Sequence, residues 1–493
     1  MALTPGGSLN SVPASQKQTL STNYIDFTST TTSGWAQQYL PDLMAQESEV
    51  FGPRTISGFL ASIGAEEPMM SDQVIWSEQG RLHLSYKATI TDLNGGTLTG
   101  GRITITQDID NTSGFTATNH GIRTNDTLLI ATSSGTMKAI VQAASAGSAV
   151  VDVAPYGAAN LTTLGNEGVA NAATVLVYGS EFAKATNGRS EANEPQFQSF
   201  SNKPIILKDY YEISGSDAGA IGWVETSSED GTAGYMWYVK AESDTRMRFA
   251  DYLEMSLLES EAGVPGTDFV DDYLSLTGAG TAVARTGTEG LFAAIETRGN
   301  TTNGITGSSA SLDFAEFDTI LAEFDRQGAI EEYMIFCNRT TSLAMDDMLA
   351  SLNSGYSGGA SYGVFSNSEG MALNLGFMGF RRGSYDFYKS DFRYLNDKAT
   401  RGSINDADST NAIRGMFIPA GVSTVYDQML GKNMMRPFLH VRYRVSTMED
   451  RYMKTWVTGG VGAATSSLDA MQLHYLSERC LVTQGANNFM LLK

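Results

Sequence analysis

Short apolar runs separated by polar turns dominate the stretch from residue 88 to residue 179. The runs are ITITQ, DTLLIAT, MKAIVQA, SAVVDVA and ATVLVYG, and Gly, Asn and Ser are frequent between them. Short runs rich in β-branched residues and bounded by turn residues are typical of β-strands. We therefore predict an inserted all-β domain, a barrel or a sandwich, over residues 89–179.

A long helix is indicated by the pattern that follows. Phe249, Leu253 and Leu257 recur at four-residue spacing and form one apolar stripe. Ser227 and Ser228 are candidate N-caps, so the helix is expected to begin near residue 230. Gly and Pro residues after position 262 end it, which gives a helix of roughly 30 residues, or about 45 Å.

Helix and strand patterns alternate in the last third of the chain. A helix is predicted from Ser311 to a stop at Gly328, then a buried strand at 333–337 and a second helix at about 340–352. Strand-like segments follow at about 384–395, 415–419, 436–445 and 470–492. The fold class expected from these patterns is α+β.

Residues 1–60 differ from the rest of the chain in composition and periodicity. They are polar and rich in Gln, Ser and Thr, with isolated aromatic residues such as Tyr24, Trp35 and Tyr39 and little periodicity. A polar terminus is ordered only when something holds it. We expect an arm that a neighbouring subunit tethers.

Composition and charge narrow the function. Lys and Arg number 33 against 54 Asp and Glu, a net charge of −21, which argues against neutralising a nucleic-acid backbone over a broad surface. With 42% hydrophobic and 18% charged residues the chain can bury a core. The start shows no signal-peptide pattern and no long apolar run occurs, so a cytoplasmic protein, or one released by lysis, is expected. The two cysteines, Cys337 and Cys480, are expected to be buried thiols.

Candidate catalytic chemistry is weak. The pattern G-x-S-x-G occurs twice, around Ser357 and Ser361, and would need His440 or His474 as a base. A strand before it and a helix after it are required, and neither pattern is present, so a flexible loop is favoured. The acidic loops at 108–112 and 406–410 lack the Gly and Glu of a calcium loop and are interpreted as ordinary turns. We expect no cofactor and no metal.

One charge pattern stands out in the segment RPFLHVRYRV. His440, Arg442 and Arg444 alternate with apolar residues, which predicts a strand with one cationic and one apolar face. Such a face could meet an acidic patch on a neighbouring copy, face an enclosed nucleic acid, or simply be solvated.

The order of arm, β insert, long helix and α+β module resembles the major capsid protein of tailed double-stranded-DNA bacteriophages, the Hong Kong 97 fold, which encapsulin compartments share. The segments that carry the resemblance are GIRTNDTLLI, GTMKAIVQA, NEPQFQSFSNKPIILKDYYEIS, GYMWYVKAESDTRMRFADYLEMSLLES and SLDFAEFDTILAEF before EEYMIFCN. The closing LSERCLVTQGANNFMLL looks most like capsid proteins of crAss-like phages.

The resemblance implies a division of the chain into five parts. These are an N-terminal arm at 1–60, an extended loop at 61–88 and 180–226, the inserted β domain at 89–179, a peripheral domain with the spine helix at 227–310 and 431–480, and an axial domain at 311–430 and 481–493. The residues expected at subunit contacts are Tyr24, Trp35, Tyr39, Phe51, Arg54, Phe182, Phe197, His440, Arg442 and Arg444.

The function implied is that of a shell protein without enzymatic activity. It would self-assemble into hexamers and pentamers of an icosahedral head in the host bacterial cytoplasm and enclose double-stranded DNA without reading its sequence. Its partners would be further copies of itself, a portal, and auxiliary or head-decoration proteins, with no membrane involved. The alternatives are an encapsulin-like compartment for protein cargo, a serine hydrolase using Ser357 or Ser361, and a surface adhesin, which would need an export signal.

Overall fold

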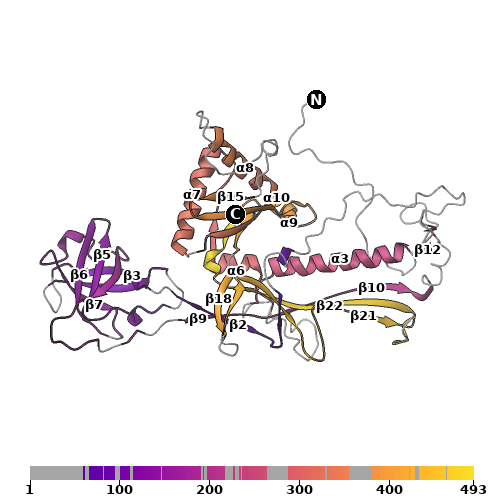
Figure 1. Ribbon diagram of the computed structural model, residues 1–493, viewed down its shortest axis with the longest axis horizontal. Helices are drawn as coiled ribbons and strands as arrows, with labels where there is room; N and C mark the ends of the chain where they lie inside the picture. The colour runs from indigo at the N-terminus through magenta and orange to yellow at the C-terminus, as the bar shows by residue number, and fades with distance from the viewer. Residues whose placement is uncertain are drawn as a thin grey trace. The chain divides into compact units, whose positions relative to one another are not determined.

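The computed structural model describes the chain as two compact units (Figure 1). The unit from Ser77 to Phe200 is continuous, and the other unit combines residues 1–76 with 201–493. The residues described are 59–60, 66–80, 83–94, 100–110, 115–145, 147–189, 192–193, 197–216, 226–227, 233–234, 236–263, 287–327, 330–354, 379–420, 422–427, 432–461 and 464–493.

The continuous unit is built around a closed six-stranded barrel with the strand order β3-β4-β7-β6-β5-β8. Its strands are β3 (Ser85–Asp92), β4 (Gly101–Asp108), β5 (Asp126–Thr132), β6 (Gly135–Ala144), β7 (Val150–Pro155) and β8 (Ala173–Ser180). Alternate apolar residues such as Ile103, Leu128 and Val175 fill the interior and are fully buried. Four of the five sequence runs lie wholly in strands, and the run SAVVDVA begins two residues before β7. The strand β3 begins four residues before the predicted boundary at residue 89.

Two chain crossings connect the units. The strands β2 (Val74–Gln79) and β9 (Phe197–Asn202) pair as a two-stranded sheet, and both unit boundaries fall within them. At the end of β9, buried Asn202 accepts hydrogen bonds from Thr288 and Glu289 and donates to the backbone oxygens of Glu289 and Leu481. These bonds fix the point where the chain re-enters the larger unit.

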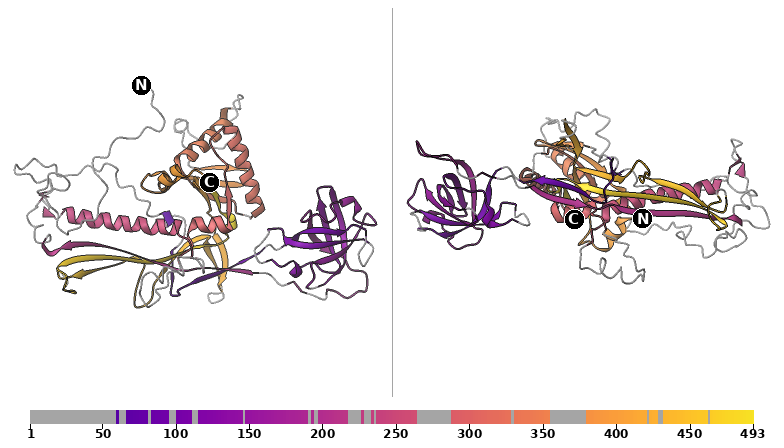
Figure 2. Two further views of the ribbon diagram at one scale, coloured as in Figure 1. Left: turned by 180° about the vertical axis from the view of Figure 1, so that it is seen from behind. Right: turned by 90° about the horizontal axis from the view of Figure 1, so that it is seen from below.

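A five-stranded sheet and one long helix form the first half of the larger unit. The sheet has the order β1-β20-β22-β10, with β21 beside β22. The strands are β1 (Glu66–Met69), β10 (Ile205–Ser214), β20 (Leu439–Arg444), β21 (Lys454–Gly459) and β22 (Ala470–Thr483). The helix α3 (Met236–Glu259) runs along this sheet (Figures 1 and 2). Its residues Phe249, Leu253 and Leu257 are buried, and the Phe249 ring lies 5.8 Å from the ring of Tyr475 on β22.

The start of α3 differs from the prediction. The helix has 24 residues and begins at Met236, whereas Ser227 lies in β11 (Thr226–Ser227), which pairs with β12 (Ala233–Gly234). Strand pairing therefore uses backbone groups that the predicted helix would have needed. The glycine-containing sequence before Met236 also favours a turn over a helix.

The second half of the unit is a six-stranded sheet in the order β13-β23-β17-β14-β16-β15, with α7 (Ala310–Gln327) and α8 (Arg339–Ser354) beside it. The strands are β13 (Asn300–Thr302), β14 (Glu332–Cys337), β15 (Gly379–Arg382), β16 (Tyr385–Asp391), β17 (Gly415–Pro419) and β23 (Met490–Leu492). The remaining elements in the described part of this unit are α6 (Leu291–Arg298), α9 (Arg393–Asn396), α10 (Arg401–Ala407), β18 (Val422–Asp427), β19 (Lys432–Pro437) and η4 (Ala486–Asn488).

Both helices and the strand between them lie within about two residues of their predicted bounds, but two predicted strands are divided. The 384–395 segment ends as a strand at Asp391 and continues as α9. The 470–492 segment becomes β22, η4 and β23, so it contributes to two sheets. The chain is thus a mixed α and β protein, as its patterns predicted.

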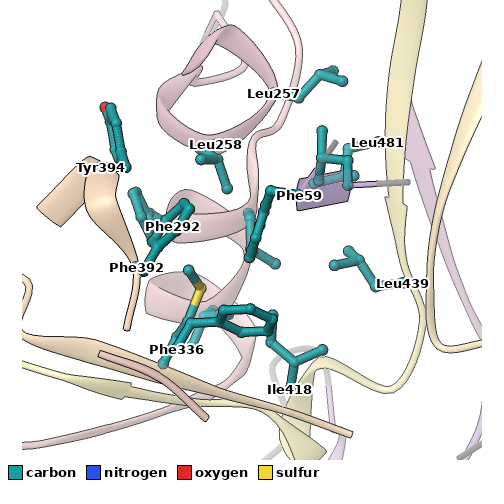
Figure 3. Packing of buried hydrophobic residues seen from close by; sticks show 14 of the residues in the cluster. Phe59, Leu257, Leu258, Phe292, Phe336, Phe392, Tyr394, Ile418, Leu439 and Leu481 are labelled. Atoms are coloured by element: carbon teal, nitrogen blue, oxygen red, sulfur yellow. The ribbon is translucent and has the colours of Figure 1, made fainter. Parts of the chain in front are cut away.

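The main core of the larger unit joins elements from distant parts of the chain (Figure 3). Phe59 stacks on Phe392 with 4.4 Å between ring centroids and meets Phe336 edge-on at 4.7 Å. The backbone N–H of Leu60 donates to Glu254 of α3 at 3.2 Å. Residues 59–60 are therefore fixed in the core, where the described part of the chain begins.

Candidate assembly surface

The residues predicted at subunit contacts do not form one described cluster. Tyr24, Trp35, Tyr39, Phe51 and Arg54 lie outside the described residues, as does the side chain of Phe197. Phe182 follows β8 of the barrel and is 36% exposed.

The predicted cationic stripe on β20 is paired within the chain. His440 is buried, with its Nδ1 3.3 Å from the backbone oxygen of Pro437. Arg442 forms an ion pair with Glu67 at 2.6 Å, and Arg444 pairs with Asp72 and with Glu478. Arg442 and Arg444 therefore have acidic partners within the chain, because β1, which carries Glu67, lies parallel to β20 and places this acid beside Arg442. Their place at subunit contacts stays a prediction.

The pairing extends into a network at the end of the sheet. Glu478 has a side chain only 5% exposed and accepts from both Arg444 and Arg451, while Arg451 also pairs with Glu449 at 3.3 Å. Arg479 pairs with Glu66 of β1 at 3.0 Å. Two guanidinium groups stabilise this nearly buried carboxylate, which would be costly to bury alone. The network therefore links β1, β20 and β22 through ion pairs at this end of the sheet.

A hollow of about 450 Å³ lies against the network. It is bordered by Arg444, Glu449 and Glu478 together with the apolar Met70 and Ile206. Met70 is 71% exposed and Ile206 is 51% exposed. Large apolar side chains left in water beside an ordered polar cluster are typical of interaction surfaces.

Next to the hollow, three strands carry matched rows of side chains on the sheet face opposite α3. Tyr210 of β10, His474 of β22 and Trp456 of β21 are register partners and form one row. The neighbouring residues Asp209 and Tyr475 contact Arg248 and Phe249 of α3, which sets the row on the other face because side chains alternate. These rings lie in sequence order 210, 456 and 474, so no local pattern connects them.

The rows beside the rings are also ordered. On one side Lys208, Leu476 and Lys454 are register partners, and on the other Glu212, Gln472 and Thr458 are. Gln472 donates to Glu212 at 2.6 Å, and Thr458 donates to Gln472 at 3.3 Å. The Thr458 hydroxyl also lies 2.6 Å from His474 Nε2. The His474 and Trp456 rings stack at 5.1 Å with an interplanar angle of 16°, and Tyr210 follows at 6.0 Å.

The described residues offer no support for the catalytic alternative. Ser357 and Ser361 lie outside them, and the two histidines that would have served as a base contact Thr458 and the backbone of Pro437. Within the described ranges no group of three His, Cys, Asp or Glu residues could hold a metal ion. None of the described helices is both long enough and apolar enough to cross a membrane.

No protein-family model matches the chain, and no curated protein matches it. Solved structures do resemble it. A structure from Gordonia phage Cozz is 9% identical, with a TM-score of 0.38 over 97% of this chain and 99% of the other. One from Microbacterium phage Oxtober96 is 10% identical, with a TM-score of 0.36 over 92% and 96%. The capsid structure of the cyanophage P-SCSP1u is 8% identical, with a TM-score of 0.33 over 64% and 80%.

Proposed function

We propose that this chain is the major capsid protein of a tailed bacteriophage and builds the shell of its head. The proposal includes a Hong Kong 97 type of fold with an inserted β domain, most similar to capsid proteins of crAss-like phages. Copies of the chain would form hexamers and pentamers and enclose double-stranded DNA. Assembly would take place in the host cytoplasm, and a portal and auxiliary or decoration proteins would join the shell.

The observation that carries the proposal is the order of elements along the chain. A closed barrel stands between the paired strands β2 and β9, the 24-residue helix α3 follows, and an α/β module with α7, β14 and α8 comes next. This order agrees with the arrangement that the sequence resemblance implies. A shell is closed by repeated contacts between identical subunits, so such a protein needs many contact surfaces and no catalytic centre.

The parts of the chain take roles within this proposal. Residues 1–60 would be the arm, and its aromatic residues Tyr24, Trp35 and Tyr39 would contact neighbouring subunits. The paired strands β2 and β9 would belong to the extended loop, which the barrel decorates. Within the larger unit, the five-stranded sheet with α3 would belong to the peripheral domain, and the six-stranded sheet with α7 and α8 to the axial domain. Arg442 and Arg444 are paired with acids of their own chain, and a contact of these two residues or of His440 with a neighbouring subunit stays a prediction.

Electron microscopy of the protein expressed alone, with light scattering after size-exclusion chromatography, tests the proposal. We expect closed shells, tubes or rings. Deletion of residues 1–45 should leave the circular dichroism of the folded units unchanged and prevent closed particles, because the arm is the tether between subunits. A strictly monomeric full-length protein would contradict a self-assembling shell, and protein cargo in place of DNA in shells made during infection would favour the encapsulin-like alternative.

A further inference from the structure

The face formed by Tyr210, His474, Trp456, Lys208 and Lys454, here called the lysine–aromatic face, contains none of the residues named above as expected subunit contacts. Tyr210 is 55% exposed and Lys208 is exposed. Among the described residues, no carboxylate pairs with Lys208. Ile206, two residues earlier on the same face of β10, is also exposed. Cations and half-exposed aromatic rings thus stand together on a flat sheet surface.

Three side chains of this face, those of Lys454, Trp456 and His474, are held in place before any partner arrives. Lys454 lies 5.6 Å from the centroid of the Trp456 ring and 2.8 Å from Glu449. The hydrogen bond between Thr458 and His474 fixes the imidazole, which in turn stacks on Trp456. Side chains that are already ordered lose little conformational entropy on binding, which favours association.

The geometry of the rings indicates what the face binds. His474 and Trp456 stack on each other, and Tyr210 is tilted by 30° against His474, so the ring faces point mainly along the row instead of outward. A nucleic acid is a poor ligand for this face for two reasons. Its bases need open ring faces for stacking, and the net charge of −21 on the chain repels its phosphates. The outward edges and the lysine ammonium groups suit an acidic protein surface better.

A complementary surface is present on the same chain. The helix α10 exposes Ile404, which is 57% accessible, and Asp408 follows one turn later as the residue that closes the helix. The Asp408 carboxylate accepts hydrogen bonds from Asn411 and Thr410, which lower its pKa and keep it charged. An apolar side chain beside a fixed carboxylate matches a face of rings beside lysines.

We propose that the lysine–aromatic face binds an acidic surface of a second copy of this chain. The proposal rests on the proposed function and adds to it a particular contact. Two different surfaces meet in such a contact, so it is heterologous, and heterologous contacts generate rings and larger assemblies instead of isolated dimers. Charge complementarity across it orients the approaching copy and excludes wrong pairings.

Zero-length carbodiimide cross-linking of the assembled full-length protein tests the contact. Copies grown on ¹⁴N and ¹⁵N are mixed, assembled and cross-linked, and the peptides are identified by mass spectrometry. We expect mixed-isotope peptides that join Lys208 or Lys454 to an Asp or Glu of another copy. Their absence from assembled protein would overturn the proposal, as would protection of Lys208 that disappears when packaged nucleic acid is digested.

Charge reversal provides a second measurement. Lys208→Glu should raise the protein concentration needed for assembly roughly tenfold, because like charges then face each other. Lys184→Glu makes the same charge change at an exposed turn of the barrel unit and is the matched control. If the Lys208 variant assembles like the control while wild-type protein forms shells, the contact is wrong and the shell function stands. If wild-type protein does not associate at all, both proposals fail.

Discussion

Single side chains decide how the N-terminal part of the chain is attached. Phe59 is 7% exposed and contacts two other phenylalanine rings, while the backbone N–H of Leu60 donates to Glu254.

The two cysteines have a structural role only. Burial raises the pKa of both Cys337 and Cys480 to about 12. Such thiols carry almost no thiolate near neutral pH and are inert.

Replacing Phe59 with Ala should lower the free energy of unfolding of the larger unit by about 3–5 kcal/mol, because the lost ring leaves a cavity beside Phe336 and Phe392. Urea denaturation followed by circular dichroism measures the change in the free energy of unfolding. Leu312→Ala is a suitable control, since Leu312 lies on α7 and is 50% exposed. Equal stabilities of the two variants would show that Phe59 is not part of the core.

At the scale of elements, the short strand β1 has an effect far beyond its length. By pairing in parallel with β20 it brings Glu66 and Glu67 next to Arg479 and Arg442 and turns a cationic strand into a neutralised one. The edge of the sheet therefore carries ion pairs, with Glu478 at their centre.

Glu478→Ala should cost about 3 kcal/mol in the free energy of unfolding, since it leaves Arg444 and Arg451 without their shared, nearly buried partner. Asp72→Ala removes another partner of Arg444, but the Asp72 side chain is 87% exposed, so little change is expected. Thermal and urea melts of both variants compare the two sites. A loss at Asp72 as large as that at Glu478 would contradict this view of the network.

At the scale of the whole molecule, the two units have separate cores. Every residue of the barrel cluster lies between Leu84 and Val177, and the two other clusters belong to the larger unit. A closed barrel also leaves no open sheet edge. The barrel unit therefore has what an independent domain needs.

A fragment spanning residues 77–200 should fold by itself. We expect a β-type circular dichroism spectrum, dispersed amide resonances and one cooperative thermal transition, because its hydrophobic cluster is complete within the fragment. The same transition should appear separately in melts of the full chain. A fragment with a disordered spectrum would show that the barrel needs the rest of the protein.

Local pattern was sufficient for most individual elements. The β-branched runs at 103–179 became barrel strands, and the Phe249, Leu253 and Leu257 stripe became the buried side of α3. These signals are periodic within a few residues, so each segment determines its own conformation. The start of α3 was misjudged because good capping residues are common in turns as well.

Which residues become neighbours in the folded protein depends on pairing between strands that are far apart in the sequence. Nothing near Arg442 in the chain indicates Glu67, and nothing near Tyr210 indicates Trp456 or His474. The alternation in IILKDYYEIS shows only that Ile206, Lys208 and Tyr210 share a side of one strand. Composition and periodicity thus determined the kinds of element and the overall charge of this protein. Its ion-pair network and its lysine–aromatic face exist because strands hundreds of residues apart pair in one register, which is a property of the folded sheet and not of any segment.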